Sequence, residues 1–472
     1  MKVLSVTSEC APLVKTGGLA DVAGALPAAL APHGVEMRTL LPGYPAVMAA
    51  IGESEVVWEG ETGAPGGPAR LIIAKTAGLE LLVYDAPQHF GRDGNIYLGP
   101  DGKDWPDNPE RFAALCQAAV TICDGEADGW TPDIVHCHDW QAGFAPYYLK
   151  GAVPTLLTIH NIAFHGLAEA AKLKALDLAE QDFTRDGFEF WGRISALKAG
   201  LLWSTKINTV SETYAAELMR PEFGMGMDGV LKARADDFSG ILNGIDLDAW
   251  NPATDGAIST YKTPRGKAKA KRTLQNAMGL PDDACGPLCV VISRLTEQKG
   301  LDLLAEALPA LLDRGGQLAL LGSGDARFEQ QFHGLAKDRN VAVRIGYDEP
   351  LSHRMIAGGD AILVPSRFEP CGLTQLYGLR YGTIPLVSLT GGLADTVIPA
   401  SPAALAKKAA TGLQFHPVTS DALARALIKL CDLYAAPEIW NQMQRNAMSH
   451  PVGWDTSAAS YAALYKDLAG AE

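Results

Sequence analysis

The stretch KTGGLAD, residues 15–21, decides the fold of this chain. An apolar run at residues 3–7 precedes it and predicts a strand, and residues 19–30 after it predict a helix. Two glycines at a strand-to-helix turn let the backbone approach a ligand closely, and the unpaired N–H groups of a helix start attract an anion. Taken alone, such a turn is more often ordinary turn chemistry than a phosphate site.

The same letters return near the other end of the chain. Residues 390–395 read TGGLAD, again after an apolar strand candidate at 384–389. Strand-like and helix-like segments alternate in both halves, which predicts parallel sheets covered by helices. Turn residues at 251–256 (NPATDG) indicate a boundary. We therefore predict an α/β protein with Rossmann-like domains at residues 1–250 and 251–453, and a final helical segment, 454–472, that packs across both.

Composition narrows the possible partners. The net charge of −14 disfavours nucleic acid and anionic membranes, because the average field of the protein would repel both. The apolar runs have the length of strands, well short of the roughly 20 residues that span a bilayer. The first apolar run is too short for the core of a signal peptide. We therefore expect a cytoplasmic protein without a membrane or nucleic-acid partner.

Cysteine and histidine spacing gives little support for a metal centre. The chain has 8 cysteines without a repeated C-x-x-C spacing, which indicates reduced thiols. Residues 136–139 (HCHD) place two histidines on one face of a strand candidate. A second Cys/His cluster that would complete a site is missing from the sequence. We expect no metal and no cofactor.

Polar side chains follow many of the predicted strands. In parallel α/β sheets, ligands bind beyond the carboxyl ends of the strands, so these residues outline a candidate site. Helix capping is the alternative, and it suits Ser211 best; after His160 no clear helix begins. The polar pairs are Ser8-Glu9, His138-Asp139, His160-Asn161, Ser211-Glu212 and Asn243-Gly244.

Two stretches of the second half suit a sugar diphosphate. Residues 293–300 (SRLTEQKG) place Arg294 and Lys299 after a strand candidate, and two cations there fit a diphosphate. Residues 365–376 carry Glu369 just before a predicted helix whose first N–H groups could receive phosphate, while the carboxylate could hold sugar hydroxyls or simply cap the helix.

Two other stretches carry less weight. The basic run at 265–272 predicts a solvated helix face rather than a nucleic-acid patch. The glycines at 322–324 lack the third glycine of a dinucleotide fingerprint, because Arg327 stands there.

At this point the motifs amount to a family match over essentially the whole chain. The sequence resembles bacterial glycogen synthases, which share a family with plant starch synthases and are retaining glycosyltransferases of the two-Rossmann-domain GT-B architecture. The motifs that carry the resemblance are KTGGLAD, HCHDWQ (136–141), TIHNIAF (158–164), EFGMG (222–226), NGID (243–246), SRLTEQKG, PSRFEPCGLTQL (365–376) and TGGLADTV (390–397).

The resemblance implies both a reaction and an architecture. Glucose would pass from ADP-glucose to the non-reducing end of an α-1,4-glucan such as glycogen, with release of ADP. The two domains would face each other across a deep cleft and close on the ligand, with the C-terminal helix crossing back. Because no carboxylate nucleophile is evident, we favour front-face attack by the acceptor hydroxyl over a covalent glycosyl intermediate.

The resemblance also implies roles for individual residues. Catalytic roles fall to Lys15, Asp139, His160, Arg294, Lys299 and Glu369. Tyr347 would stack on adenine, and Tyr97 is a candidate on the acceptor side. The remaining substrate-binding candidates are Gly17, Gly18, Asp21, Asn161, Asn243, Cys371, Gly372, Leu373 and Thr374.

The chain departs from the family pattern at two positions. Many enzymes of this architecture carry a second glutamate eight residues after the first, where this chain has Tyr377, and that removes one contact to the ribose. His165 stands where relatives often have glutamine.

Three alternative functions stay open. A related transferase could use UDP-glucose or another acceptor. A catalytically silent glucan-binding protein would not need the leaving-group cations. A nicotinamide oxidoreductase lacks its fingerprint.

Overall fold

Two sheets, one in each half of the chain, organise the computed structural model, which describes residues 1–470. Unit 1 comprises Met1–Asn243 together with the end of the chain from Trp454, and unit 2 comprises Gly244–Gly453. The units divide close to the predicted limit at residue 250. The final helix belongs to unit 1, and its predicted contact with the other domain stays a prediction.

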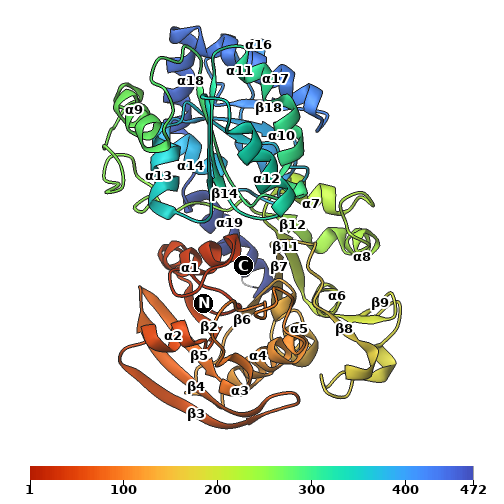
Figure 1. Cartoon of the computed structure of the whole chain (residues 1–472). Coiled ribbons are helices and arrows are strands. Elements are labelled where there is room, and N and C mark those ends of the chain that lie inside the picture. Colours follow the sequence, from red (N-terminus) through yellow and green to blue (C-terminus); the bar gives the residue numbers. More distant parts are fainter. Residues whose placement is uncertain (471–472) are drawn as a thin grey trace. The chain divides into compact units, whose positions relative to one another are not determined.

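The sheet of unit 1 has the strand order β12-β11-β7-β6-β1-β2-β5-β4-β3 (Figure 1). Neighbours from β12 to β5 run parallel, and β4 and β3 extend the sheet as an antiparallel meander. The β3–β4 hairpin turns at residues 63–66, in a stretch rich in glycine and proline. The strands are β1 Lys2–Val6, β2 Glu36–Pro42, β3 Ser54–Thr62, β4 Gly67–Thr76, β5 Leu79–Asp85, β6 Ile134–His138, β7 Thr155–Ile159, β11 Lys206–Thr209 and β12 Phe238–Gly240.

Helices cover this sheet, and the last of them comes from the end of the chain. Helix α19 packs beside α1, and Figure 1 shows the two together. Their contact contains the buried Val22, Leu26, Tyr461 and Tyr465. The helices of unit 1 are α1 Gly18–Leu30, α2 Pro45–Ala50, α3 Pro87–Phe90, α4 Asn108–Cys123, α5 Ala145–Leu149, α6 Ala196–Trp203, α7 Glu212–Leu218, α8 Asp228–Ala233 and α19 Asp455–Leu468.

A second, small sheet lies in unit 1, in the order β8-β10-β9. Its strands are β8 Leu167–Glu169, β9 Glu189–Phe190 and β10 Arg193–Ser195. The sequence pattern of residues 193–202 is that of a single helix, which is wrong for Arg193–Ser195, because these residues form β10. Ser195 ends β10 and caps α6 by accepting the Lys198 N–H at 3.1 Å, so the helix begins only after it.

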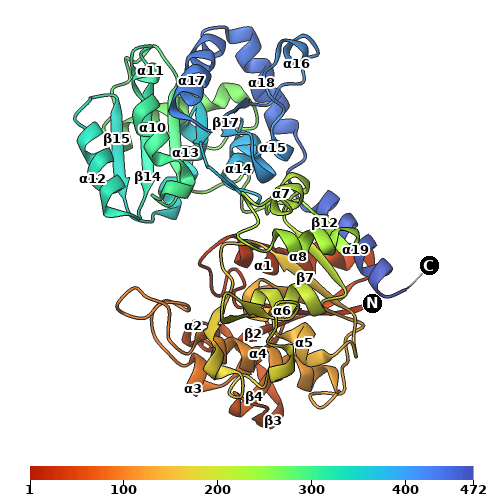
Figure 2. The ribbon, with the colours of Figure 1, turned by 90° about the vertical axis from the view of Figure 1, so that its right-hand side faces the viewer.

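Unit 2 contains an all-parallel sheet in the order β15-β14-β13-β16-β17-β18, the strand order of a Rossmann domain. Helices lie on both faces of this sheet (Figure 2). The strands are β13 Leu288–Ile292, β14 Gln317–Gly322, β15 Val341–Ile345, β16 Ala361–Val364, β17 Ile384–Ser388 and β18 Leu413–Phe415. The helices are α9 Lys267–Met278, α10 Leu301–Ala307, α11 Pro309–Leu312, α12 Ala326–Leu335, α13 Glu349–Gly358, α14 Thr374–Tyr381, α15 Gly391–Thr396, α16 Pro402–Ala406, α17 Ser420–Tyr434 and α18 Pro437–Ser449.

The basic run at 265–272 is not a uniformly solvated helix face, which corrects the prediction. Lys267 is buried and donates to Thr383 Oγ1 at 2.6 Å and to the Ala357 carbonyl at 2.7 Å. Lys271 is largely buried and pairs with Asp360 at 2.6 Å. One side of α9 therefore packs against the domain through lysines whose ammonium groups have partners.

The cysteines are free thiols, and most are buried, in agreement with the sequence. Within residues 1–470, none of the helices combines the length and apolar character that crossing a bilayer requires.

Candidate active site

The strand orders define one topological switch point in each unit. In unit 1, β1 and β6 are neighbours whose connections lead to opposite sides of the sheet, and β13 and β16 are the corresponding pair in unit 2. Ligands of parallel α/β sheets bind beyond the carboxyl ends of such strands. The loops after these four strands contain Lys15, Asp139, Lys299 and Glu369.

Glu9 organises the KTGGLAD loop of unit 1. Its buried carboxylate accepts the Thr16 N–H at 2.5 Å, the Thr16 hydroxyl at 2.6 Å and the Gly17 N–H at 3.1 Å. Three donors from one turn fix the backbone ahead of α1. The sequence marked Glu9 only as a polar strand end and missed this role. The signal in the sequence that could have revealed this role was an acidic residue so close to the end of a buried strand.

Tyr97 belongs to the same hydrogen-bond network. Its hydroxyl donates to Glu9 Oε1 at 2.7 Å and lies 2.8 Å from Ser8 Oγ. Burial and the charge of Glu9 raise the pKa of Tyr97 well above its usual value, so its proton stays on the oxygen. The structure thus joins Tyr97, a candidate on the acceptor side, to the loop that carries Lys15.

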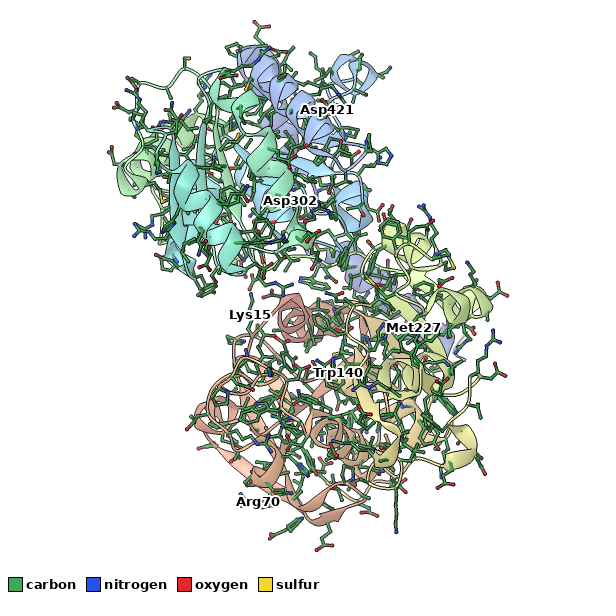
Figure 3. All side chains as sticks on the ribbon, turned by 45° about the vertical axis from the view of Figure 1, so that its right-hand side comes forward. Lys15, Arg70, Trp140, Met227, Asp302 and Asp421 are labelled. Carbon is green, nitrogen blue, oxygen red and sulfur yellow. The ribbon has the colours of Figure 1, made fainter. Side chains whose placement is uncertain are left out.

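Lys15 lies in the loop before α1 and is labelled in Figure 3. Its Nζ is 2.7 Å from Asp21 Oδ1, and the lysine side chain keeps 46% of its exposure. Gly17 is the N-cap in an extended conformation, and Gly18 is the first helical residue. A half-exposed pair of this kind stabilises the fold little, so its ammonium group can be redirected to an anionic ligand at small cost.

Asp139 adopts a backbone conformation that residues other than glycine rarely adopt, with φ 54° and ψ −165°. Its Oδ1 accepts the His160 N–H at 2.7 Å and the Asn161 N–H at 3.3 Å. Burial raises the pKa of Asp139 to about 7, although these two hydrogen bonds oppose the shift. The carboxyl group thereby ties the end of β6 to the end of β7.

A chain of hydrogen bonds runs from the sheet to His160. The Nε2 of His160 lies 3.0 Å from Nδ1 of His138, whose Nε2 lies 3.1 Å from Ser5 Oγ. Burial lowers the pKa of His160 to about 3, so both rings are neutral at pH 7. Each neutral imidazole has one N–H donor and one acceptor nitrogen, so the hydrogen bonds along this chain all run in the same direction. His138 therefore holds the orientation of the His160 ring and couples the tautomers of the two rings.

The corresponding site of unit 2 contains an ion pair whose carboxylate is buried and whose lysine is partly buried. Lys299 Nζ lies 2.5 Å from Glu369 Oε2, and Ser366 Oγ donates to the same oxygen at 2.8 Å. Arg294 also lies beyond β13, but it is exposed and has no ion-pair partner within residues 1–470. One cation is thus held by the protein and a second is open to an anion.

The PSRFEPCG loop and the second TGGLAD turn lie against each other. The Gly392 N–H donates to the Glu369 carbonyl at 3.2 Å and to the Pro370 carbonyl at 3.1 Å. Gly372 has φ 71°, a left-handed conformation that suits glycine, and α14 begins two residues later. Cys371 is buried, whereas Gly372 and the two residues after it are partly exposed at the helix start.

Other predicted residues lie apart from these networks. Tyr347 follows β15 with 83% of its surface exposed, and its hydroxyl donates to Glu349 at 3.2 Å. Asn243, the last residue of unit 1, is buried, and its Oδ1 has no hydrogen-bond partner in the described structure. The roles of these and of the other predicted site residues stay predictions.

Tyr377, which stands where many enzymes of this architecture have a second glutamate, belongs to an aromatic stack. The Trp250 ring lies between Tyr377, at 3.7 Å between centroids, and His353, at 3.9 Å. His353 and Tyr381 both bond Asp255, at 2.7 and 2.6 Å. An aromatic ring at this position therefore fastens α13 to α14.

Comparison with known proteins identifies the family. The starch synthase catalytic domain model matches residues 2–233, and the glycosyl transferases group 1 model matches residues 282–448. A glycogen synthase of Paracoccus denitrificans is 62% identical over 99% of both chains. Glycogen synthase 1 of Rhizobium radiobacter is 51% identical over 99% of both chains. The chain belongs to the glycogen synthase family of glycosyltransferases.

Comparison with solved structures agrees with the assignment to the glycogen synthase family. The catalytic domain of starch synthase IV from Arabidopsis thaliana, bound to ADP and acarbose, has a TM-score of 0.89 and 31% identity over 99% of both chains. Sucrose-phosphate synthase from Thermosynechococcus elongatus, with a TM-score of 0.60 and 19% identity over the whole of both chains, shares the fold alone. The predicted GT-B class, with a Rossmann-like domain in each half of the chain, is confirmed.

Proposed function

We propose that this glycosyltransferase moves glucose from ADP-glucose to the non-reducing end of an α-1,4-glucan, with retention of the anomeric configuration and release of ADP, in the cytoplasm. The observation that carries the proposal is the Lys299–Glu369 pair beside the start of α14 in unit 2. A cation and helix N–H groups suit the oxygens of a diphosphate, and a carboxylate suits the hydroxyls of the attached sugar. All three kinds of group occur here at one edge of the sheet.

The donor side follows from the charge that develops during the reaction. Breaking the anomeric C–O bond places negative charge on the departing ADP and positive charge on the sugar. Lys299 and the open Arg294 neutralise the diphosphate, while the N–H groups from Gly372 to Thr374 bind its oxygens. Glu369 holds glucose hydroxyls, and Tyr347 stacks on the base. Groups already in place lower the barrier without reorganising.

The acceptor side uses the residues of unit 1. His160, oriented by His138, and Asp139 bind the sugar near the reacting carbon, and Tyr97 contributes to the acceptor side. Lys15 supplies a positive charge to the donor phosphate when its ammonium leaves Asp21. The neutral state of His160 suits a hydrogen-bonding role rather than a charged one.

The stereochemical course is front-face attack, in which the acceptor hydroxyl enters on the side from which ADP leaves. A slowed donor analogue followed by mass spectrometry of the intact protein tests this course. We expect no glycosylated side chain, and a trapped adduct on a carboxylate would replace front-face attack with a two-step mechanism.

The experiment that tests the function compares donors. Wild-type protein is incubated with glycogen and either ADP-glucose or UDP-glucose, and the released nucleotide is measured together with radiolabelled glucose in the polymer. We expect equal amounts of ADP and incorporated glucose, with at least a tenfold preference for ADP-glucose. A preference for UDP-glucose would favour the related transferase, and absence of transfer from both would reject the proposal.

A further inference from the structure

The tip of the small sheet in unit 1 presents an exposed tryptophan. Trp191 and Gly192 form the two-residue turn between β9 and β10, with φ 50° and 78°. Both values are positive, as in the tight hairpin turn that normally selects Asn-Gly or Asp-Gly. A bulky side chain at this position is costly, and 85% of the Trp191 surface faces solvent. Neither packing nor turn chemistry explains the tryptophan.

Two further large apolar side chains are exposed on loops of unit 1. Met225 in the EFGMG motif is 41% exposed, and Phe164 in the TIHNIAF motif is 55% exposed. The ring of Phe190 connects these loops, because it lies 4.8 Å from the His165 ring and 6.4 Å from the Trp191 ring.

The EFGMG loop itself reaches this aromatic pair. A Cβ added at Gly226 would lie 3.1 Å from Phe190 Cζ and 3.9 Å from Trp191 Nε1. Phe190 and Trp191 thus lie beside the loops in which Phe164 and Met225 are the neighbours of His165 and Gly226, and we call Phe164, Phe190, Trp191 and Met225 the aromatic platform. It extends from the loop after β7 to the segment before α8, at the edge of unit 1 where Figure 1 labels β9 and α8.

We propose that the aromatic platform binds an α-1,4-glucan chain, which names a second contact for the polymeric substrate and rests on the proposed function. A pyranose ring presents an apolar C–H face that stacks on an exposed indole, while its hydroxyls need polar partners at the rim. Arg193, directly after the turn, pairs with Glu169 at 3.2 Å, and both side chains are well exposed. Donors and acceptors for hydroxyls thus border the apolar surface.

A second copy of the chain fits the aromatic platform less well. Each copy carries a net charge of −14, so two copies repel one another, whereas a neutral glucan meets no such barrier. A polymer with many identical chain ends also gains from a contact away from the reacting end, because the second contact raises the local concentration of ends.

Glycogen binding without donor tests the inference independently of the reaction. Dissociation constants are measured by affinity electrophoresis in glycogen-containing gels for wild type, Trp191→Ala, Trp191→Phe and Trp58→Ala. Trp58 is partly buried on β3, outside the platform, and is the matched tryptophan control. We expect Trp191→Ala to weaken binding about tenfold, or ~1.4 kcal/mol, Trp191→Phe to stay within about threefold of wild type because a ring remains, and Trp58→Ala to match wild type.

Kinetics and mass complete the test. The KM for glycogen should rise in Trp191→Ala by a larger factor than the KM for maltotriose, because a three-unit acceptor offers the platform fewer glucose units than a polymer does. Wild-type glycogen affinity in Trp191→Ala would overturn the inference, and so would a change in oligomeric mass by light scattering with glycogen binding intact. If wild type transfers no glucose but binds glycogen through Trp191, the proposed function fails and the platform stands.

Discussion

Lys299 Nζ lies 2.5 Å from Glu369 Oε2, and the two side chains come from loops that follow neighbouring parallel strands, β13 and β16. The Glu369 side chain keeps 8% of its exposure and that of Lys299 keeps 18%. A carboxylate that is so little exposed to solvent needs its cation to compensate its charge. Removing either partner therefore leaves the other charge poorly compensated. The pair therefore also fixes the ammonium group at the strand edge where we place the diphosphate.

Glu369→Gln is expected to lower kcat for glucose transfer by about 10²–10³-fold. The amide keeps the shape of the side chain but loses the charge that orients Lys299 and holds the sugar. ADP binding, measured by calorimetry, should persist because Lys299 and Arg294 remain. Activity within a few-fold of wild type would show that Glu369 is not part of the site.

Lys15→Gln is expected to reduce kcat/KM for ADP-glucose at least tenfold while the free energy of unfolding falls by less than about 1 kcal/mol, because the Lys15–Asp21 pair is half exposed. Lys75→Gln is the matched control, since Lys75 pairs with Glu80 and is 74% exposed. Steady-state kinetics and urea unfolding measure the two quantities. If the loss of kcat/KM, expressed as a free energy, equalled the loss in the free energy of unfolding, Lys15 would be a structural residue.

Glu9→Gln is expected to lower both stability and activity. Thr16, Gly17 and Tyr97 all donate to the Glu9 carboxylate, so a glutamine would turn its NH₂ toward one of these donors. The unsatisfied contact should cost about 1–3 kcal/mol in urea unfolding, and kcat should fall at least tenfold because the loop of Lys15 loses its anchor.

Glu36→Gln provides the control for Glu9→Gln. Glu36 lies at the surface, and among the hydrogen bonds of residues 1–470 its carboxylate accepts only the Trp130 indole N–H, at 2.7 Å. An amide oxygen can keep that bond, so stability and activity should stay near wild type. If Glu9→Gln behaved like Glu36→Gln, the organising role of Glu9 would be wrong.

Lys267 makes stability depend on pH. Burial lowers its pKa to about 7, whereas the unfolded chain titrates near 10.5. Between these values the unfolded state binds more protons, so the free energy of unfolding should rise with pH from about 7 to about 10, by at most about 1.4 kcal/mol per unit. Lys267→Met should remove this rise in urea unfolding, and Lys269→Met, exposed on the same helix, should retain it. Parallel profiles for all three proteins would contradict the assignment.

The sequence predicted the fold where its pattern was periodic and local. Apolar strands followed by glycine turns gave both Rossmann-like halves, and Ser211 caps α7 as expected. It failed at β10, because three residues of a short strand look like the start of the helix that follows. It also misjudged Lys267, because an amphipathic pattern does not show which lysines find partners from distant parts of the chain, here the end of α13 and the residue before β17.

Positions of site residues were predictable from strand ends, but their partners were not. The motifs pointed to Lys299 and Glu369 separately, and 70 residues separate them in the chain. The hub role of Glu9 arises only when Tyr97, 88 residues away, comes back to it. Such pairings depend on strand order, which local spacing does not encode.

The measurement that tests the central claim most directly is NMR of the polymer product made from ADP-glucose labelled with ¹³C at C1. We predict that the labelled glucose enters glycogen only in α-1,4 linkage, in amounts equal to the ADP released, and that Glu369→Gln loses this signal. A β-linked product, another linkage, or undiminished transfer by Glu369→Gln would contradict the account.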